Sequence, residues 1–205
     1  MHTTNIITGG ADLQHAGKAL LMIHGRGGSA ADIMSVAQYL NVSDYALLAP
    51  EATNNTWYPL SFLAPASANE PWLSSALNVI DQTVNKAVAA GIATTDIYFL
   101  GFSQGACLTL EYVTQNAQRY GGVVAFTGGL IGQTINQNNY KGNFDNTPVF
   151  IGTSNPDPHV PVDRVYMTSE MITEMGGNVT TRVYENMGHT INNDEISQAN
   201  ALIFK

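Results

Sequence analysis

Short apolar runs alternate with longer segments of helical spacing about six times along the chain, and this alternation constrains the fold more than any other feature. The run at 18–24 (KALLMIH) is apolar without interruption and ends in a glycine-rich turn, which is typical of a strand buried on both faces. The segment 71–90 has apolar residues three or four positions apart, which indicates a helix with one buried side. Repeated alternation of this kind predicts an α/β protein with a mostly parallel central sheet and helices on both faces.

The pattern divides the whole chain into such elements. Strands are expected at 18–24, 45–49, 96–100, 123–127, 148–151 and, as an outer strand, 179–184. Helices are expected at 30–40, 71–90, 103–118, 162–175 and 194–204. With no internal repeat or linker, the 205 residues are expected to form a single domain over 1–205. Ligands bind beyond the carboxyl ends of the strands in such sheets, so chemistry is expected in the loops that follow strands.

Charge and cysteine content narrow the classes of partner. Charged residues make up only 12% of the chain and the formal net charge is −8, which argues against binding to nucleic acid or to an anionic membrane. No apolar stretch reaches the roughly 18 residues of a membrane span. The start of the chain does not resemble a signal peptide, and the lone Cys107 allows no internal disulfide, so we expect a cytoplasmic protein. The low charge content would also permit a homodimer.

The strongest local motif is the pentapeptide 101–105 (GFSQG), directly after the expected strand 96–100. It fits the G-x-S-x-G pattern, in which a sharp strand-to-helix turn projects a serine hydroxyl above the sheet. The motif has a glycine two positions before and two positions after the serine, because side chains there would collide with the neighbouring strand and helix. The motif predicts that Ser103 is a nucleophile at the amino-terminal end of a helix.

A serine nucleophile needs a base and an acid, which in this arrangement follow it in the order Ser, acid, His. His189 follows the last expected strand and is the predicted base, whereas His159 lies on the loop where the acid belongs. Asp157 follows the strand 148–151 and is the predicted acid, which would orient and stabilise the imidazolium. Asp163 and Asp194 have a simpler interpretation as helix caps.

The transition state of acyl transfer also needs two backbone N–H donors for its oxyanion. Gln104 follows the nucleophile and is expected to supply one of them. The loop 24–28 (HGRGG), after the first buried strand, is expected to supply the other through the N–H of Arg26. His24 precedes a tight turn at a strand end and is interpreted as structural.

Four segments now define a resemblance that covers nearly the whole chain: the His24–Gly25 turn, 101–106 (GFSQGA), 157–161 (DPHVP) and the Gly188–His189 loop. Together they resemble the phospholipase/carboxylesterase family of α/β-hydrolases, which includes acyl-protein thioesterases and small bacterial carboxylesterases. The resemblance implies hydrolysis of esters or thioesters through an acyl-enzyme, without metal or cofactor. It also supports the roles of the triad and of the two oxyanion-hole amides.

The chain departs from the acyl-protein thioesterases at Arg26, where they have a leucine. This favours a small, polar ester over a long acyl chain on a protein. We hypothesise that the Arg26 side chain receives an anionic or polar group of the substrate. The alternative is an arginine that points into solvent.

The loop after the second expected strand carries aromatic residues that could form a substrate wall. The family has an aromatic pair at a similar place, so Trp57 and Tyr58 are predicted to bind substrate, although both could instead pack the loop onto the core. Met187, beside the predicted base, is a further candidate for the pocket.

Other functions remain open at this stage. A thioesterase would use the same triad, and a lactonase resembling dienelactone hydrolases would share the fold, although those enzymes usually carry a cysteine nucleophile. A hydrolase fold that only binds a ligand would be expected to have lost triad members. Neither a metal-ligand cluster nor a nucleotide-binding glycine motif is present in the sequence. The expected partner is therefore a small-molecule ester.

Overall fold

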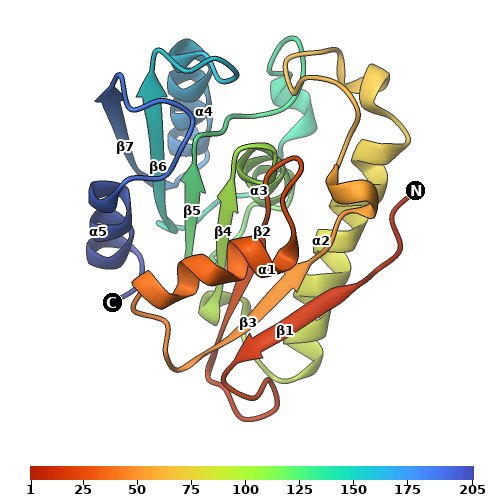
Figure 1. Ribbon diagram of the computed structural model, residues 1–205, viewed down its shortest axis with the longest axis vertical. Coiled ribbons are helices and arrows are strands. Elements are labelled where there is room, and N and C mark those ends of the chain that lie inside the picture. Colours follow the sequence, from red (N-terminus) through yellow and green to blue (C-terminus); the bar gives the residue numbers. More distant parts are fainter.

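The computed structural model describes residues 1–205 and contains one seven-stranded sheet in the order β1-β3-β2-β4-β5-β6-β7 (Figure 1). The strands are β1 (Ile6–Gly10), β2 (Lys18–Ile23), β3 (Tyr45–Pro50), β4 (Ile97–Phe102), β5 (Gly122–Phe126), β6 (Pro148–Asn155) and β7 (Asn178–Glu185). Strands β2 to β7 are parallel, and β1 pairs antiparallel with β3. The predicted α/β architecture with a mostly parallel sheet is confirmed.

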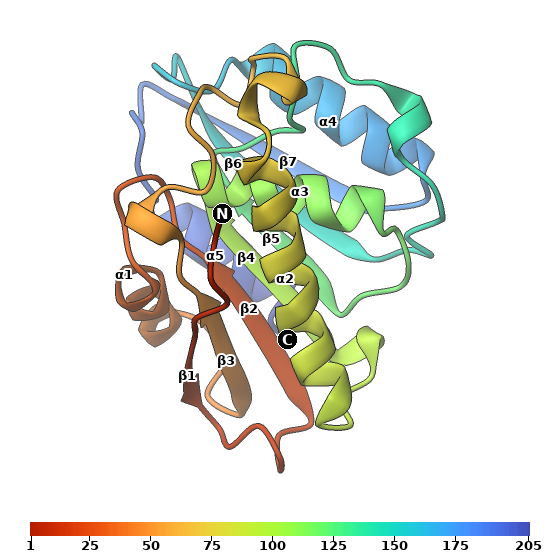
Figure 2. The ribbon, with the colours of Figure 1, turned by 90° about the vertical axis from the view of Figure 1, so that its right-hand side faces the viewer.

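Helices cover both faces of this sheet. They are α1 (Ala30–Ser35), α2 (Trp72–Ala89), α3 (Gln104–Gln115), α4 (Val162–Glu174) and α5 (Asn193–Leu202). The view along the sheet shows α2, α3 and α4 on one face and α1 and α5 on the other (Figure 2). None of these helices combines the length and the apolar character needed to cross a membrane.

Two apolar cores follow from this arrangement, one on each side of the sheet. In β2, Leu21 and Ile23 belong to the core under α2, α3 and α4, whereas Leu20 and Met22 belong to the core under α1 and α5. Successive side chains of a strand point to opposite faces, so an uninterrupted apolar run serves both cores at once.

The structure differs most from the sequence-based expectation in three elements. The edge strand β1 was not expected, because its five residues are largely exposed and have no apolar pattern. Strand β6 continues four residues beyond Ile151, since Thr153 and Ser154 are buried and all eight residues pair with β7. The helix expected at 30–40 ends at Ser35 and continues as a 3-10 turn, Val36–Tyr39.

The strand order brings the loops of interest together. Strands β2 and β4 are neighbours, with Ile23 opposite Gly101. The loop after β2 and the loop after β4 therefore start side by side at the carboxyl edge of the sheet, which is where ligands bind in such folds. The loops after β6 and β7 start at the same edge.

Candidate active site

Ser103 occupies a strained turn between β4 and α3. Its φ of 55° and ψ of −120° lie in a region that residues with side chains rarely adopt. The turn is held by hydrogen bonds from the Ser103 N–H to the Phe126 carbonyl (2.9 Å) and from the Cys107 N–H to the Ser103 carbonyl (3.0 Å). A Cβ on Gly105 would overlap the carbonyl oxygens of Ile23 and His24, so this position tolerates only glycine without a backbone shift.

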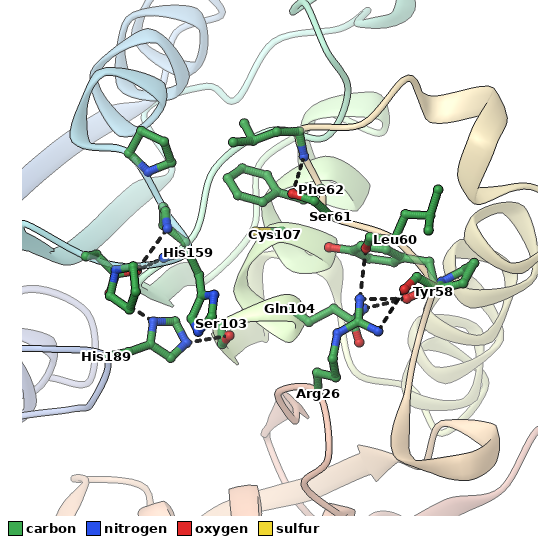
Figure 3. A pocket seen from close by; sticks show the side chains of 16 residues that line it. Arg26, Tyr58, Leu60, Ser61, Phe62, Ser103, Gln104, Cys107, His159 and His189 are labelled. Carbon is green, nitrogen blue, oxygen red and sulfur yellow. Dashed lines mark hydrogen bonds and ion pairs between the residues drawn. The ribbon is translucent and has the colours of Figure 1, made fainter.

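The three predicted triad side chains meet in the structure, and Figure 3 shows Ser103 beside His189. The Oγ of Ser103 lies 2.7 Å from Nε2 of His189, and Nδ1 of His189 lies 2.9 Å from Oδ2 of Asp157. The Asp157 side chain is 0% exposed and that of His189 is 20% exposed. Such a chain of hydrogen bonds suits transfer of the serine proton to a histidine held by a carboxylate.

Asp157 is fixed by its own loop. Its Oδ1 accepts hydrogen bonds from the N–H groups of His159 (2.8 Å) and Val160 (2.9 Å), leaving Oδ2 for His189. Burial alone would raise the pKa of this carboxyl, but the hydrogen bonds outweigh burial and hold the pKa below its ordinary value. Asp157 is therefore ionised at neutral pH, as a partner for an imidazolium must be.

His189 is held from several sides. The Gly188 N–H donates to Ser154 Oγ (3.0 Å), which anchors the loop to the end of β6. The imidazole packs against the Phe102 ring (centroids 5.3 Å apart) and meets the His159 ring edge to face (4.9 Å). Helix α5 then starts at an Asn192 cap instead of the expected Asp194.

The proposed oxyanion-hole amides lie on the two adjacent loops. The Gly27 N–H donates to the Asn55 carbonyl and the Gly28 N–H to the Gly25 carbonyl, but the N–H of Arg26, the residue just before them, makes no such bond. Gln104 is the first residue of α3, so its N–H has no acceptor within the helix and lies at the positive end of the helix dipole. Both N–H groups are thus available to an oxyanion.

A cavity of about 610 Å³ adjoins Ser103. One side is formed by 58–63 with Arg26, and the opposite side by 157–161 with His189 (Figure 3). At its inner end lies Cys107, one helical turn after Ser103, where burial raises the pKa of the thiol to about 12. No group of three or more His, Cys, Asp or Glu side chains is placed to hold a metal ion.

Of the predicted pocket residues, only Tyr58 lines this cavity. Trp57 is 0% exposed, lies behind the wall, and donates from Nε1 to the His24 carbonyl (2.9 Å), so its contacts are those of a core residue. Met187 contacts Asn192 at the cap of α5 and is not part of the lining. The placement of Trp57 and Met187 does not support direct contact with substrate.

The side chains of His24 and Arg26 both have structural partners. His24 is buried, donates from Nδ1 to the Gly25 carbonyl and accepts at Nε2 from the Ala52 N–H. The Arg26 guanidinium bonds to the carbonyls of the 58–60 segment, so it does not simply point into solvent.

His159 and Cys107 line the cavity although neither was expected there, whereas Phe62 is one of the loop aromatic residues weighed as a substrate wall. His159 and Cys107 could have been inferred, because His159 follows Asp157 on the same loop and Cys107 lies on the same helical face as Ser103. The orientation of Phe62 depends on the path of its loop, which the sequence does not specify.

The fold and the geometry around Ser103 define an α/β-hydrolase of the serine type. The chain belongs to the phospholipase/carboxylesterase family, whose profile matches residues 6–205. It is 53% identical to a phospholipase/carboxylesterase from Dyadobacter fermentans whose crystal structure superposes with a TM-score of 0.99, covering 100% of this chain and 98% of that one.

The chain is also similar to two more distant proteins. Acyl-protein thioesterase 1 of Saccharomyces cerevisiae is 28% identical over 221 residues, which span 95% of both proteins. The crystal structure of esterase PE8 has the same fold, with a TM-score of 0.80, 22% identity and 95% coverage of each chain.

Proposed function

We propose that this protein is a carboxylesterase that cleaves carboxylic esters of small to medium size through an acyl-enzyme on Ser103. The observation that carries the proposal is the continuous hydrogen-bond chain from Ser103 Oγ through His189 to Asp157. Its members come from three separate loops, so a chance arrangement of this geometry is not expected.

In the first half-reaction, Ser103 Oγ attacks the ester carbonyl carbon while its proton passes to Nε2 of His189. The carbonyl oxygen becomes an oxyanion that accepts hydrogen bonds from the Arg26 and Gln104 N–H groups. Collapse breaks the bond to the alcohol oxygen, which takes the proton from His189. Water then repeats the sequence on the acyl-enzyme, with His189 as base, and releases the acid and free Ser103.

The cavity supports the choice of substrate size. A volume of about 610 Å³ lies within the range of small-molecule sites, and its lining mixes the apolar Phe62, Leu63 and Val160 with polar groups. A thioesterase is the second candidate, favoured by the similarity to acyl-protein thioesterase 1, because a thioester meets the same nucleophile and the same oxyanion donors.

The test is hydrolysis of p-nitrophenyl esters from acetate to palmitate by the wild type and by Ser103→Ala, with matched acyl thioesters assayed beside them. We expect the wild type to be most active on short and medium chains, and Ser103→Ala to lose at least about a thousandfold in kcat. The exposed Ser43, before β3 and far from the site, provides the control variant Ser43→Ala, which should remain fully active.

Labelling with a fluorophosphonate probe gives an independent readout, because only an activated serine reacts. If the wild type were labelled but hydrolysed none of the esters, Ser103 would be reactive and the natural substrate would differ from the p-nitrophenyl esters tested. Absence of both labelling and turnover would refute the proposal and favour a fold that only binds a ligand. The cytoplasmic location, the homodimer and the lack of nucleic-acid binding stay predictions from the sequence.

A further inference from the structure

The segment Trp57–Leu60, of which Tyr58–Leu60 form a wall of the cavity, lacks the usual backbone support. None of these four residues makes a hydrogen bond to another backbone group. Side chains hold the segment instead: the Leu60 N–H donates to Asn69 Oδ1 (2.8 Å) and the Trp57 N–H donates to Gln104 Oε1 (2.9 Å). The position of this wall therefore depends on the residues that supply those side chains.

Arg26 makes the largest contribution to this support. Its Nη2 donates to the carbonyls of Tyr58 (2.9 Å) and Leu60 (2.8 Å), and its Nη1 donates to that of Pro59 (3.1 Å). Three successive carbonyls thus converge on one planar guanidinium, as Figure 3 shows. The ion pairs of the chain are His15–Asp12 and His189–Asp157, so no carboxylate competes for Arg26.

Gln104 holds the same segment from the other side. Its Nε2 donates to the Tyr58 carbonyl (2.8 Å), which therefore accepts from both Gln104 and Arg26. These two residues also carry the proposed oxyanion-hole amides. The side chains of Arg26 and Gln104 thus connect the wall that faces the substrate to the two backbone positions proposed to face the oxyanion.

We propose that the Arg26 side chain is a positioning residue that clamps the Tyr58–Leu60 wall against the oxyanion hole and so determines which acyl or alcohol groups fit beside Ser103. The proposed effect of this clamp on substrate choice rests on the proposed esterase function. The clamp assigns Arg26 a role other than binding an anionic substrate group, because three of the five N–H donors of the guanidinium already bond to carbonyls. A wall displaced by about 1 Å can reduce productive binding by up to a hundredfold.

The test compares wild type with Arg26→Met, which keeps an unbranched apolar side chain but removes the donors and the charge, and with Arg26→Lys, which keeps a charge and three donors. Arg182→Met is the control, since it removes the same charge from the exposed face of β7. Two readouts are used. Hydrogen–deuterium exchange follows the amides of Trp57 and Leu60, and kinetics compare neutral p-nitrophenyl butyrate with the anionic p-nitrophenyl hemisuccinate.

We expect Arg26→Met to speed exchange at these amides by about tenfold or more, because the wall opens locally. KM should rise by about tenfold on both esters with kcat changed by less than about threefold, and Arg26→Lys should recover part of the loss. If these amides exchanged in Arg26→Met at the wild-type rate, the clamp would be overturned. It would also be overturned if KM rose only for the anionic hemisuccinate, which would indicate that Arg26 binds an anionic group of the substrate. If no ester were hydrolysed but exchange changed as expected, the proposed function would fail and the clamp would stand.

Discussion

The carboxyl group of Glu195 lies against Gly152 of β6, in a space that a Cβ at position 152 would fill. Glu195 is 0% exposed, and its Oε2 accepts from the Asn192 N–H while Oε1 has no hydrogen-bond partner. Burial, aided by the nearby Asp194, raises the pKa of Glu195 from 4.5 to about 7. Asn192, the cap of α5, lies three residues after His189 and donates to the Glu195 carboxyl. Protonation of Glu195 therefore links the stability of α5 and of the His189 loop to pH.

Glu195→Gln should remove a pH-dependent loss of stability. Between the unfolded pKa of 4.5 and the folded pKa of about 7, the folded protein keeps a proton that the unfolded chain releases, so stability falls as pH rises through this window. The wild type should lose on the order of 3 kcal/mol more than Glu195→Gln between pH 4.5 and pH 8. Urea unfolding at both pH values measures this, with the exposed Glu174→Gln as control. Equal losses in all three proteins would contradict the burial of a protonated carboxyl.

Asp157→Asn should lower kcat by about ten-thousandfold with little change in fold, since an amide cannot hold the imidazole in the required tautomer or stabilise its charged form. Asp163→Asn is the matched control, because Asp163 is an exposed carboxylate in the first turn of α4. Steady-state kinetics on one ester suffice. Comparable losses in both variants would show that Asp157 has no special place in the reaction.

Gly105→Ala should disrupt both stability and activity. The new Cβ would overlap the carbonyl oxygens of Ile23 and His24, so β2 and α3 must separate, at a cost of about 1–3 kcal/mol. Thermal unfolding together with kcat measures the two effects. Gly17→Ala is the control, since nothing lies within 4 Å of a Cβ there. A Gly105→Ala protein as stable and active as Gly17→Ala would mean that the close contact is absent in solution.

His159→Ala should lower kcat by about threefold to tenfold, because an edge-to-face aromatic contact worth about 0.5–1.5 kcal/mol no longer orients the His189 ring. His159→Phe keeps such a contact and should retain most of the activity. If Phe were as impaired as Ala, the imidazole itself would be needed, as expected for a polar contact with substrate.

Much of the architecture could be predicted because it depends on local pattern. The apolar run of β2 and the helical spacing of α2 can each be recognised in a short stretch of sequence. The period at which apolar residues recur depends only on whether the local backbone is a strand or a helix. Strand β1 was not predicted because it lies at the edge of the sheet. Pairing with β3, and not burial, keeps it extended, so it has no apolar pattern.

The site shows the same division. The Gly101–Gly105 motif and the order of Asp157 and His189 along the chain were sufficient to propose the triad, because a strained turn and a fixed topology leave few choices of residue type. Trp57 shows the limit: an indole on a loop can face either substrate or core, and its bond to the His24 carbonyl places it in the core.

The sequence by itself determined the parallel strands, the approximate positions of the helices and the three residues proposed as the triad. Only the tertiary structure decided that Arg26 clamps the Tyr58–Leu60 wall and that Glu195 is buried without a full set of partners. The physical reason is that both outcomes depend on contacts between residues more than 30 positions apart, Arg26 with Tyr58 and Gly152 with Glu195. The free energy of these two contacts depends on how separate segments of the chain pack in space, and no pattern of neighbouring residues specifies that packing.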